Sequence, residues 1–174
     1  MKIKQPSKQT LKCSSESIHE ASHVIVAAVM GTKEISVIAS SGKLRASVVQ
    51  GTLWGQIVTS FAGYAGDVMI SGLPEVTCLA RSTTDRTLRE TMRADVPPEV
   101  NWETLCHDAD ACARFWVNIL ELEILEFATE LEPFVIAKRD FPAEHVEALM
   151  CVKIAREAGR PHDKADQITS NGES

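Results

Sequence analysis

Residues 17–31 read SIHEASHVIVAAVMG, and this stretch decides the fold because it predicts one long helix that carries a chemical motif. The apolar residues that recur at helical spacing, and so give this helix a buried face, are Ile18, Ala21, Ile25 and Ala28. Upstream, Ser14 or Ser15 can cap the free backbone N–H groups at the start of the helix. Downstream, Gly31 can supply a left-handed turn, so we expect the helix to end at Met30.

The motif is His19-Glu20-Ala21-Ser22-His23, a His-Glu-x-x-His pattern. Residues four apart lie about one turn apart on the same helix face, so the imidazoles of His19 and His23 can converge on one metal ion. Glu20 lies one position further round, where it can reach a metal-bound water and take its proton. Two histidines alone are a weak signal. The central glutamate, the helical context and the upstream cap favour a zinc site over a chance pair of histidines.

Two histidines do not hold a catalytic zinc ion, so a third protein ligand is expected. The extended motif with a further histidine shortly downstream is absent, because His23 is followed by Val-Ile-Val-Ala-Ala. The third ligand must therefore come from another helix. The candidates are Asp67, Glu75, Asp85, Glu90 and His107.

The rest of the chain predicts a mainly α fold with a small β-hairpin. Residues 34–39 and 43–49 are two β-rich runs joined by Ser40-Ser41-Gly42, which is typical of a hairpin. Further helices are expected over about 52–70, 83–94, 102–138 and 142–158. The first of these contains three glycines, which indicate close backbone packing against a neighbour; they are Gly55, Gly63 and Gly66.

The bulk properties indicate one cytoplasmic domain. A chain of 174 residues forms a single domain, expected over 13–159 between a flexible lead (1–12) and a flexible tail (160–174). A formal net charge of -6 argues against a nucleic-acid partner, and no apolar run of about 20 residues predicts a membrane span. Five cysteines without framework spacing suit free thiols in a reducing compartment.

Three further stretches carry a family resemblance. The segment FAGYAGDVMISG (61–72), followed by STTDRTLRETM (82–92), resembles the protease domain of the FtsH-type, AAA-linked metalloproteases. The closing stretch LEPFVIAKRDFPAEHVEALM (131–150) is also similar, so the resemblance covers about residues 14–152. The resemblance implies that His19 and His23 are zinc ligands, Glu20 is the catalytic base and Asp85 is the third ligand. It places Asp67 where the family has a glutamate.

The sequence also departs from the family pattern. Ser22 replaces a glycine, Tyr64 replaces an arginine, and Asp67 is shorter than the glutamate. The printed sequence contains no ATPase module and no membrane anchor. We therefore expect it to act on peptides, unfolded segments or exposed loops, unless a separate ATPase partner delivers substrate. The family's ring assembly makes a homo-oligomer another expected partner.

Several residues have a second interpretation. Ser82-Thr83-Thr84-Asp85 is also a capping-box pattern, so Asp85 is either a metal ligand or a helix cap. Asp67, on an apolar helix, can hold the second ring nitrogen of His19 or His23, or can pair elsewhere. Either hairpin strand can pair with extended substrate backbone, or the hairpin can be an ordinary cover. The glutamates at 121, 123, 126, 130 and 132 are expected on a solvated helix face.

The sequence thus predicts a zinc-dependent metallopeptidase that hydrolyses peptide bonds with metal-activated water. The alternative is a catalytically silent, metal-stabilised binding or regulatory module of the same fold. Retention of Glu20 favours the enzyme, because a structural zinc site has no need of that base and usually fills all four positions with protein ligands. A hydrolase of non-peptide amides is a third possibility.

Overall fold

A computed structural model describes residues 13–32, 34–40, 43–49 and 51–142 of the chain. Its elements in order are α1 (Ser15–Val29), β1 (Glu34–Ser40), β2 (Lys43–Val49), α2 (Leu53–Met69), α3 (Glu75–Arg81), α4 (Thr83–Met92), a 3-10 turn (Arg93–Asp95), α5 (Trp102–Ile119) and α6 (Glu121–Ala137). The predicted mainly α fold with a small hairpin is confirmed. The predicted lead (1–12), tail (160–174) and last helix (about 142–158) lie outside the described residues, apart from Pro142. No helix in the described ranges is long and apolar enough to cross a membrane.

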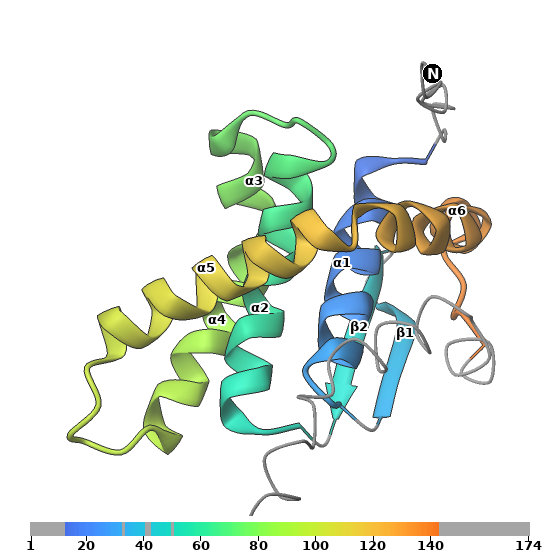
Figure 1. The fold of residues 1–174 in the computed structure, drawn as a ribbon. Coiled ribbons are helices and arrows are strands. Elements are labelled where there is room, and N and C mark those ends of the chain that lie inside the picture. The colour runs from blue at the N-terminus through green and yellow to red at the C-terminus, as the bar shows by residue number, and fades with distance from the viewer. Residues whose placement is uncertain (1–12, 33, 41–42, 50, 143–174) are drawn as a thin grey trace, which may run out of the picture.

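Helix α1 is the central element of the fold. Ser14 caps it, accepting a hydrogen bond from the backbone N–H of Ser17, and every residue from 17 to 29 is buried. A helix buried on all sides needs partners around its whole circumference. In Figure 1, α1 lies between the hairpin and α2, and α6 crosses near its N-terminal end.

The approach of α2 to α1 depends on two glycines, as the sequence predicted. A methyl group built on Gly66 would overlap the Ser22 side chain, and one built on Gly63 would overlap the rings of His19 and His23. Because neither glycine has a side chain, the backbone of α2 can lie directly against the motif face of α1. The third predicted glycine, Gly55, would bring a methyl group to 3.2 Å from the Met30 Cβ atom.

The single helix predicted over 102–138 is wrong, because the chain breaks at Leu120 into α5 and α6. Leu120 leaves the helical region (φ -104°, ψ 25°) while its side chain stays buried. The break lets the two halves pack on different partners: α5 lies against α2, and α6 lies against α1 (Figure 1). The fully buried Ile124, Phe127 and Leu131 of α6 fill the core at that contact.

A short helix that the sequence did not predict, α3, precedes α4. Gly72 and Pro74 end α2 as expected, but Pro74 also begins a new helix, which suits a residue with its φ angle fixed. This helix ends at Arg81, and α4 follows after the single residue Ser82. The Ser82 side chain makes no capping hydrogen bond to α4, so the capping box that was the alternative interpretation of this stretch does not form.

The hairpin has two unlike edges. Val37 faces Ala46 in the antiparallel register. On the outer side of β1, the Val37 carbonyl accepts from the Phe141 N–H at 3.0 Å, and the Ala39 N–H donates to the Asp140 carboxylate at 2.6 Å. The outer side of β2 faces α1 instead, where the Ala46 N–H donates to Glu20 Oε2 at 2.6 Å.

One predicted surface residue holds two helices together. Glu132 of α6 was expected on a solvated face, but its Oε2 oxygen accepts hydrogen bonds from the Ser14 N–H, the Ser14 hydroxyl and the Ser17 hydroxyl. A carboxylate at a helix N-terminus is stabilised by the unpaired N–H groups and by the helix dipole. Glu132 thus fixes the start of α1, four residues before His19.

Candidate metal centre

The two histidines are oriented by hydrogen bonds to α2. The Nδ1 atom of His23 lies 2.7 Å from the Thr59 backbone carbonyl oxygen, and the Nδ1 atom of His19 lies 2.9 Å from Asp67 Oδ2. A carbonyl or carboxylate oxygen can only accept, so in each ring Nδ1 carries the proton and donates. In the neutral rings, both Nε2 atoms therefore present a lone pair. Such outer hydrogen bonds are typical of histidines that ligate metals.

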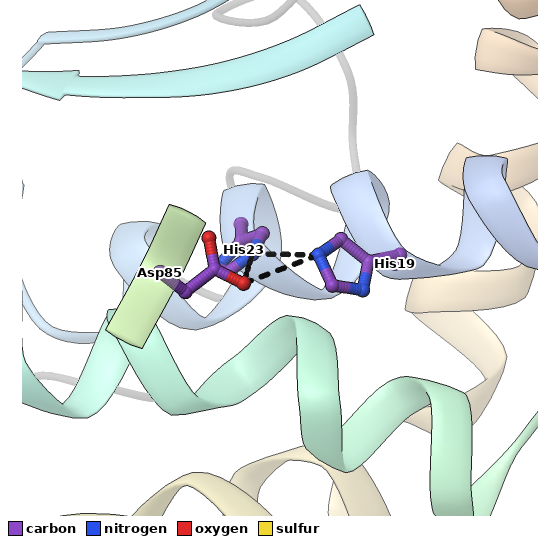
Figure 2. Close-up of side chains that lie close together, drawn as sticks. All are labelled: His19, His23 and Asp85. Carbon is purple, nitrogen blue, oxygen red and sulfur yellow. Dashed lines mark hydrogen bonds and ion pairs between the residues drawn. The ribbon is translucent and has the colours of Figure 1, made fainter. Parts of the chain in front are cut away.

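The Asp85 carboxylate completes a triangle with the two Nε2 atoms (Figure 2). The Nε2 atoms of His19 and His23 lie 3.3 Å apart, and Asp85 Oδ2 lies 3.4 Å from the first and 3.5 Å from the second. Zinc bonds of about 2.0–2.1 Å in a tetrahedron require ligand atoms about 3.3–3.4 Å apart. The three donor atoms thus have the mutual spacing of three corners of a zinc tetrahedron.

The alternative interpretation of Asp85 as a helix cap does not describe its contacts. The Asp85 carboxylate points from α4 toward the imidazoles of α1. Its buried Oδ2 atom accepts no hydrogen bond within the described part of the chain. A buried acceptor without a donor is costly unless something positive, such as a proton or a cation, meets it. These contacts favour the ligand interpretation of Asp85.

The other predicted candidates for the third ligand lie elsewhere. Glu75 accepts a hydrogen bond from the Tyr64 hydroxyl at 3.0 Å, Glu90 is exposed, and the His107 side chain is 85% exposed. Asp67 does touch the centre, but through the far nitrogen of His19. This is the outer-carboxylate arrangement that the sequence analysis raised for Asp67.

Arg81, which the sequence analysis missed, neutralises Asp67. The Asp67 side chain is fully buried, and its Oδ1 atom lies 3.3 Å from the Arg81 guanidinium. The same guanidinium donates to the Ser15 hydroxyl at 2.8 Å, so Arg81 joins α3 to the start of α1. The signal for this residue was the buried carboxylate itself, which needs a positive partner. Without α3 in the predicted fold, nothing placed Arg81 beside it.

The electrostatics of the centre show how strongly these groups interact. Burial lowers the pKa of His19, but hydrogen bonds to Asp67 and Asp85 outweigh it and raise this pKa to about 10. Burial likewise opposes the charged form of His23, and the Asp85 charge outweighs it and raises that pKa. For Asp85 itself, the charges and hydrogen bonds of both histidines overcome burial and lower the pKa. The three groups therefore favour a positive charge at their centre, which either protons or a metal ion can supply.

Glu20 lies beside the triangle, in the same cleft. It is buried, and burial is the main cause that raises the pKa of its carboxyl above the ordinary value. The cleft, of about 780 Å³, is bounded by α1, α2, α4 and the hairpin, and its lining includes His19, Glu20, His23 and Asp85. A base with a raised pKa in a cleft is a common feature of catalytic sites.

No model of a known protein family matches this chain, and no curated protein matches it at a significant level. The geometry of the site and the motifs quoted above are therefore the grounds on which a function is proposed.

Proposed function

We propose that this protein is a zinc-dependent metallopeptidase that hydrolyses peptide bonds in peptides or unfolded segments. The observation that carries the proposal is the triangle of His19 Nε2, His23 Nε2 and Asp85 Oδ2, whose sides of 3.3–3.5 Å fit zinc bonds, with Glu20 beside it. Two imidazoles and one carboxylate are a ligand set that suits catalytic zinc and leaves a fourth position open.

In this proposal, the residues of the site have different roles. His19, His23 and Asp85 would hold the ion, and Asp67 and the Thr59 carbonyl keep the imidazoles oriented. When bound, zinc acidifies water and polarises a carbonyl group. Glu20 is the base that takes a proton from the attacking water, and it later gives that proton to the leaving amine. Burial raises the pKa of the Glu20 carboxyl above its ordinary value, and a raised pKa makes this carboxylate a stronger base.

The hairpin supports a peptide as the substrate. Backbone groups in an antiparallel pair alternate between facing the partner strand and facing outward. Ala46 faces outward, toward Glu20, so Leu44 and Val48 present their backbone groups to the same edge. An extended peptide can add to such an edge by main-chain hydrogen bonds, which would place its backbone beside the centre. The outer edge of β1, by contrast, is covered by residues 140 and 141.

The proposal is tested by changing the base while keeping the ligands. The Glu20→Gln variant should retain zinc, measured by elemental analysis, and should retain its helical circular dichroism. Its cleavage of unfolded casein should fall by about 10²–10⁴-fold, the usual contribution of a general base. A His19→Ala, His23→Ala double variant should lose the metal as well.

Two results would favour the silent regulatory module instead. One is a zinc-loaded wild type that cleaves no peptide in a broad library. The other is a Glu20→Gln variant whose cleavage rate equals that of the wild type.

A further inference from the structure

One face of the hairpin carries two basic side chains at the cleft. Lys43 and Arg45 of β2 point to the same face, because they are two residues apart in a strand. Both line the cleft beside the centre, together with Ile38, which faces Arg45 across the hairpin and is 43% exposed. Neither basic side chain forms an ion pair with any residue that the structure describes.

This basic face contrasts with the molecule as a whole. The formal net charge of the chain is -6. Apart from Glu20 and Asp85 of the centre, Glu16 is the one carboxylate among the described residues that lines the cleft, and it lies on α1 rather than on the hairpin. Two cations without an ion pair among the described residues, on the strand that borders the cleft, are therefore a local reversal of the protein's charge.

A peptide added to β2 would meet these cations with every second side chain. The side chains of neighbouring strands that point to one face lie about 4.5–5.5 Å apart. An opposite-charge pair at that spacing raises the equilibrium constant for strand pairing by a factor of about 1.5–5, and a like-charge pair lowers it. The added strand would also pass the exposed part of Leu88, an apolar residue of α4 that lines the cleft and is 51% exposed.

We propose that the cleft selects extended peptides with acidic side chains at alternate positions on the strand that pairs with β2. This inference rests on the proposed peptidase function and specifies its substrate class. Lys43 and Arg45 determine the specificity by pairing with the acidic side chains. Backbone pairing with β2 positions the peptide.

The preference can be measured by binding, without turnover. The probe is a fluorescent nine-residue peptide with glutamates at alternate positions, compared with versions that carry glutamines or lysines there. Fluorescence anisotropy with zinc-loaded Glu20→Gln protein should show the tightest binding for the acidic peptide, weaker binding for the neutral one and the weakest for the basic one. The dissociation constants of the acidic and basic peptides should differ about tenfold. When the salt concentration rises from about 0.1 M to about 1 M, the Debye length falls from about 10 Å to about 3 Å. The differences in affinity between the three peptides should therefore become small.

A pair of charge reversals shows whether the hairpin face is responsible. Arg45→Glu in the Glu20→Gln background should reduce the preference for the acidic peptide over the basic peptide, or reverse it. Arg93→Glu makes the same change in net charge at an exposed residue that does not line the cleft, and should leave the order unchanged. Equal binding of the three peptides, or an equal effect of the two reversals, overturns the inference.

Cleavage of casein by the wild type separates this inference from the function on which it rests. Casein cleavage together with equal peptide binding would leave the peptidase standing and remove the acidic preference. An ordered binding series without any cleavage would keep the basic peptide-binding face and remove the enzyme. Absence of both binding and cleavage would contradict both proposals.

Discussion

Asp85 and Asp67 each have one buried carboxylate oxygen that accepts no hydrogen bond among the described residues, but that oxygen of Asp67 lies beside the Arg81 guanidinium, whereas that of Asp85 lies beside the two imidazoles. Asp67 is held by His19 and Arg81, and Glu20 accepts from the Ala46 N–H. At the scale of single residues, Asp85 is therefore the carboxylate whose charge is met either by protonated imidazoles or by a metal ion that shares them. This makes it the most informative residue to change.

We expect Asp85→Asn to weaken zinc binding by more than about 100-fold, because even outer partners of metal ligands contribute about 10–100-fold. The fold should persist, since the buried Oδ2 atom of Asp85 accepts no hydrogen bond from the described residues that the change would remove. Zinc affinity is measured by competition with a chelator, and folding by circular dichroism. Asp108→Asn, at a carboxylate that is 63% exposed on α5, is the matched control. Unchanged zinc affinity in Asp85→Asn would remove it from the ligand set.

The sequence predicted the residues of this site unevenly, for a physical reason. His19, Glu20 and His23 lie within one turn and a half of helix, so helical geometry alone brings them together. Asp85 is far away in the sequence, and its local pattern fitted a cap equally well. The family resemblance and the lack of a better third ligand favoured it as a ligand. Arg81 was missed because its partner Asp67 is brought to it by tertiary packing.

At the scale of elements, the contact between α1 and α2 shapes the centre. Gly63→Ala should displace the imidazoles, because its methyl group would overlap both Nε2 atoms, and zinc affinity should fall sharply. Gly66→Ala places its methyl group on Ser22 instead. It should cost about 1–3 kcal/mol of unfolding free energy, as overpacking usually does, while zinc affinity changes much less. Chelator competition and urea unfolding of the two variants measure this contrast. Equal loss of zinc in both variants would mean that the glycines act only through general packing.

The contact between α6 and α1 should make stability depend on pH. Burial raises the pKa of the Glu132 carboxyl, but hydrogen bonds from Ser17 and Ser14 outweigh burial and lower it below the ordinary value of 4.5. Because folding lowers this pKa, the contribution of Glu132 is complete above about pH 4.5 and is lost as the pH falls through the folded value.

The corresponding variant is Glu132→Gln, compared with Glu130→Gln at an exposed site on the same helix. At pH 7 and without metal, Glu132→Gln should lower the free energy of unfolding by about 1–2 kcal/mol, as expected for partly exposed hydrogen bonds to a charged group. The difference from wild type should shrink below about pH 4. A difference that stays constant from pH 7 to pH 3 would show that the charge of Glu132 is not involved.

The elements themselves were predicted where the pattern was local. The α1 and α2 helices and both strands agree with the apolar periodicity and the turn residues. The break at Leu120 was not predicted, because the apolar pattern continues through it. The chain breaks there because α5 packs against α2 and α6 packs against α1. Helix α3 was missed because seven residues after a proline give too short a pattern to recognise.

At the scale of the whole molecule, the centre joins two parts that differ in how deeply they are packed. Helix α1 is buried along nearly its whole length, whereas the buried residues of α3 and α4 are Cys78 and Met92 alone. Few buried apolar side chains mean a low cost of local opening. A metal ion held by His19, His23 and Asp85 would therefore tie a weakly packed pair of helices to the core.

We expect zinc to protect α3 and α4 against local opening, because the ion binds only when α4 lies against α1. At a free zinc concentration 100 times the dissociation constant, the gain is about 2.7 kcal/mol, which corresponds to about 100-fold slower exchange of amides that open there. Hydrogen exchange with mass spectrometry, with zinc and then with a chelator, measures it over residues 75–92. Amides of α5 serve as the internal reference, since that helix contributes no ligand. The His19→Ala, His23→Ala variant should show no difference between the two conditions. Equal exchange of α4 with and without zinc in the wild type would mean that Asp85 does not hold the ion.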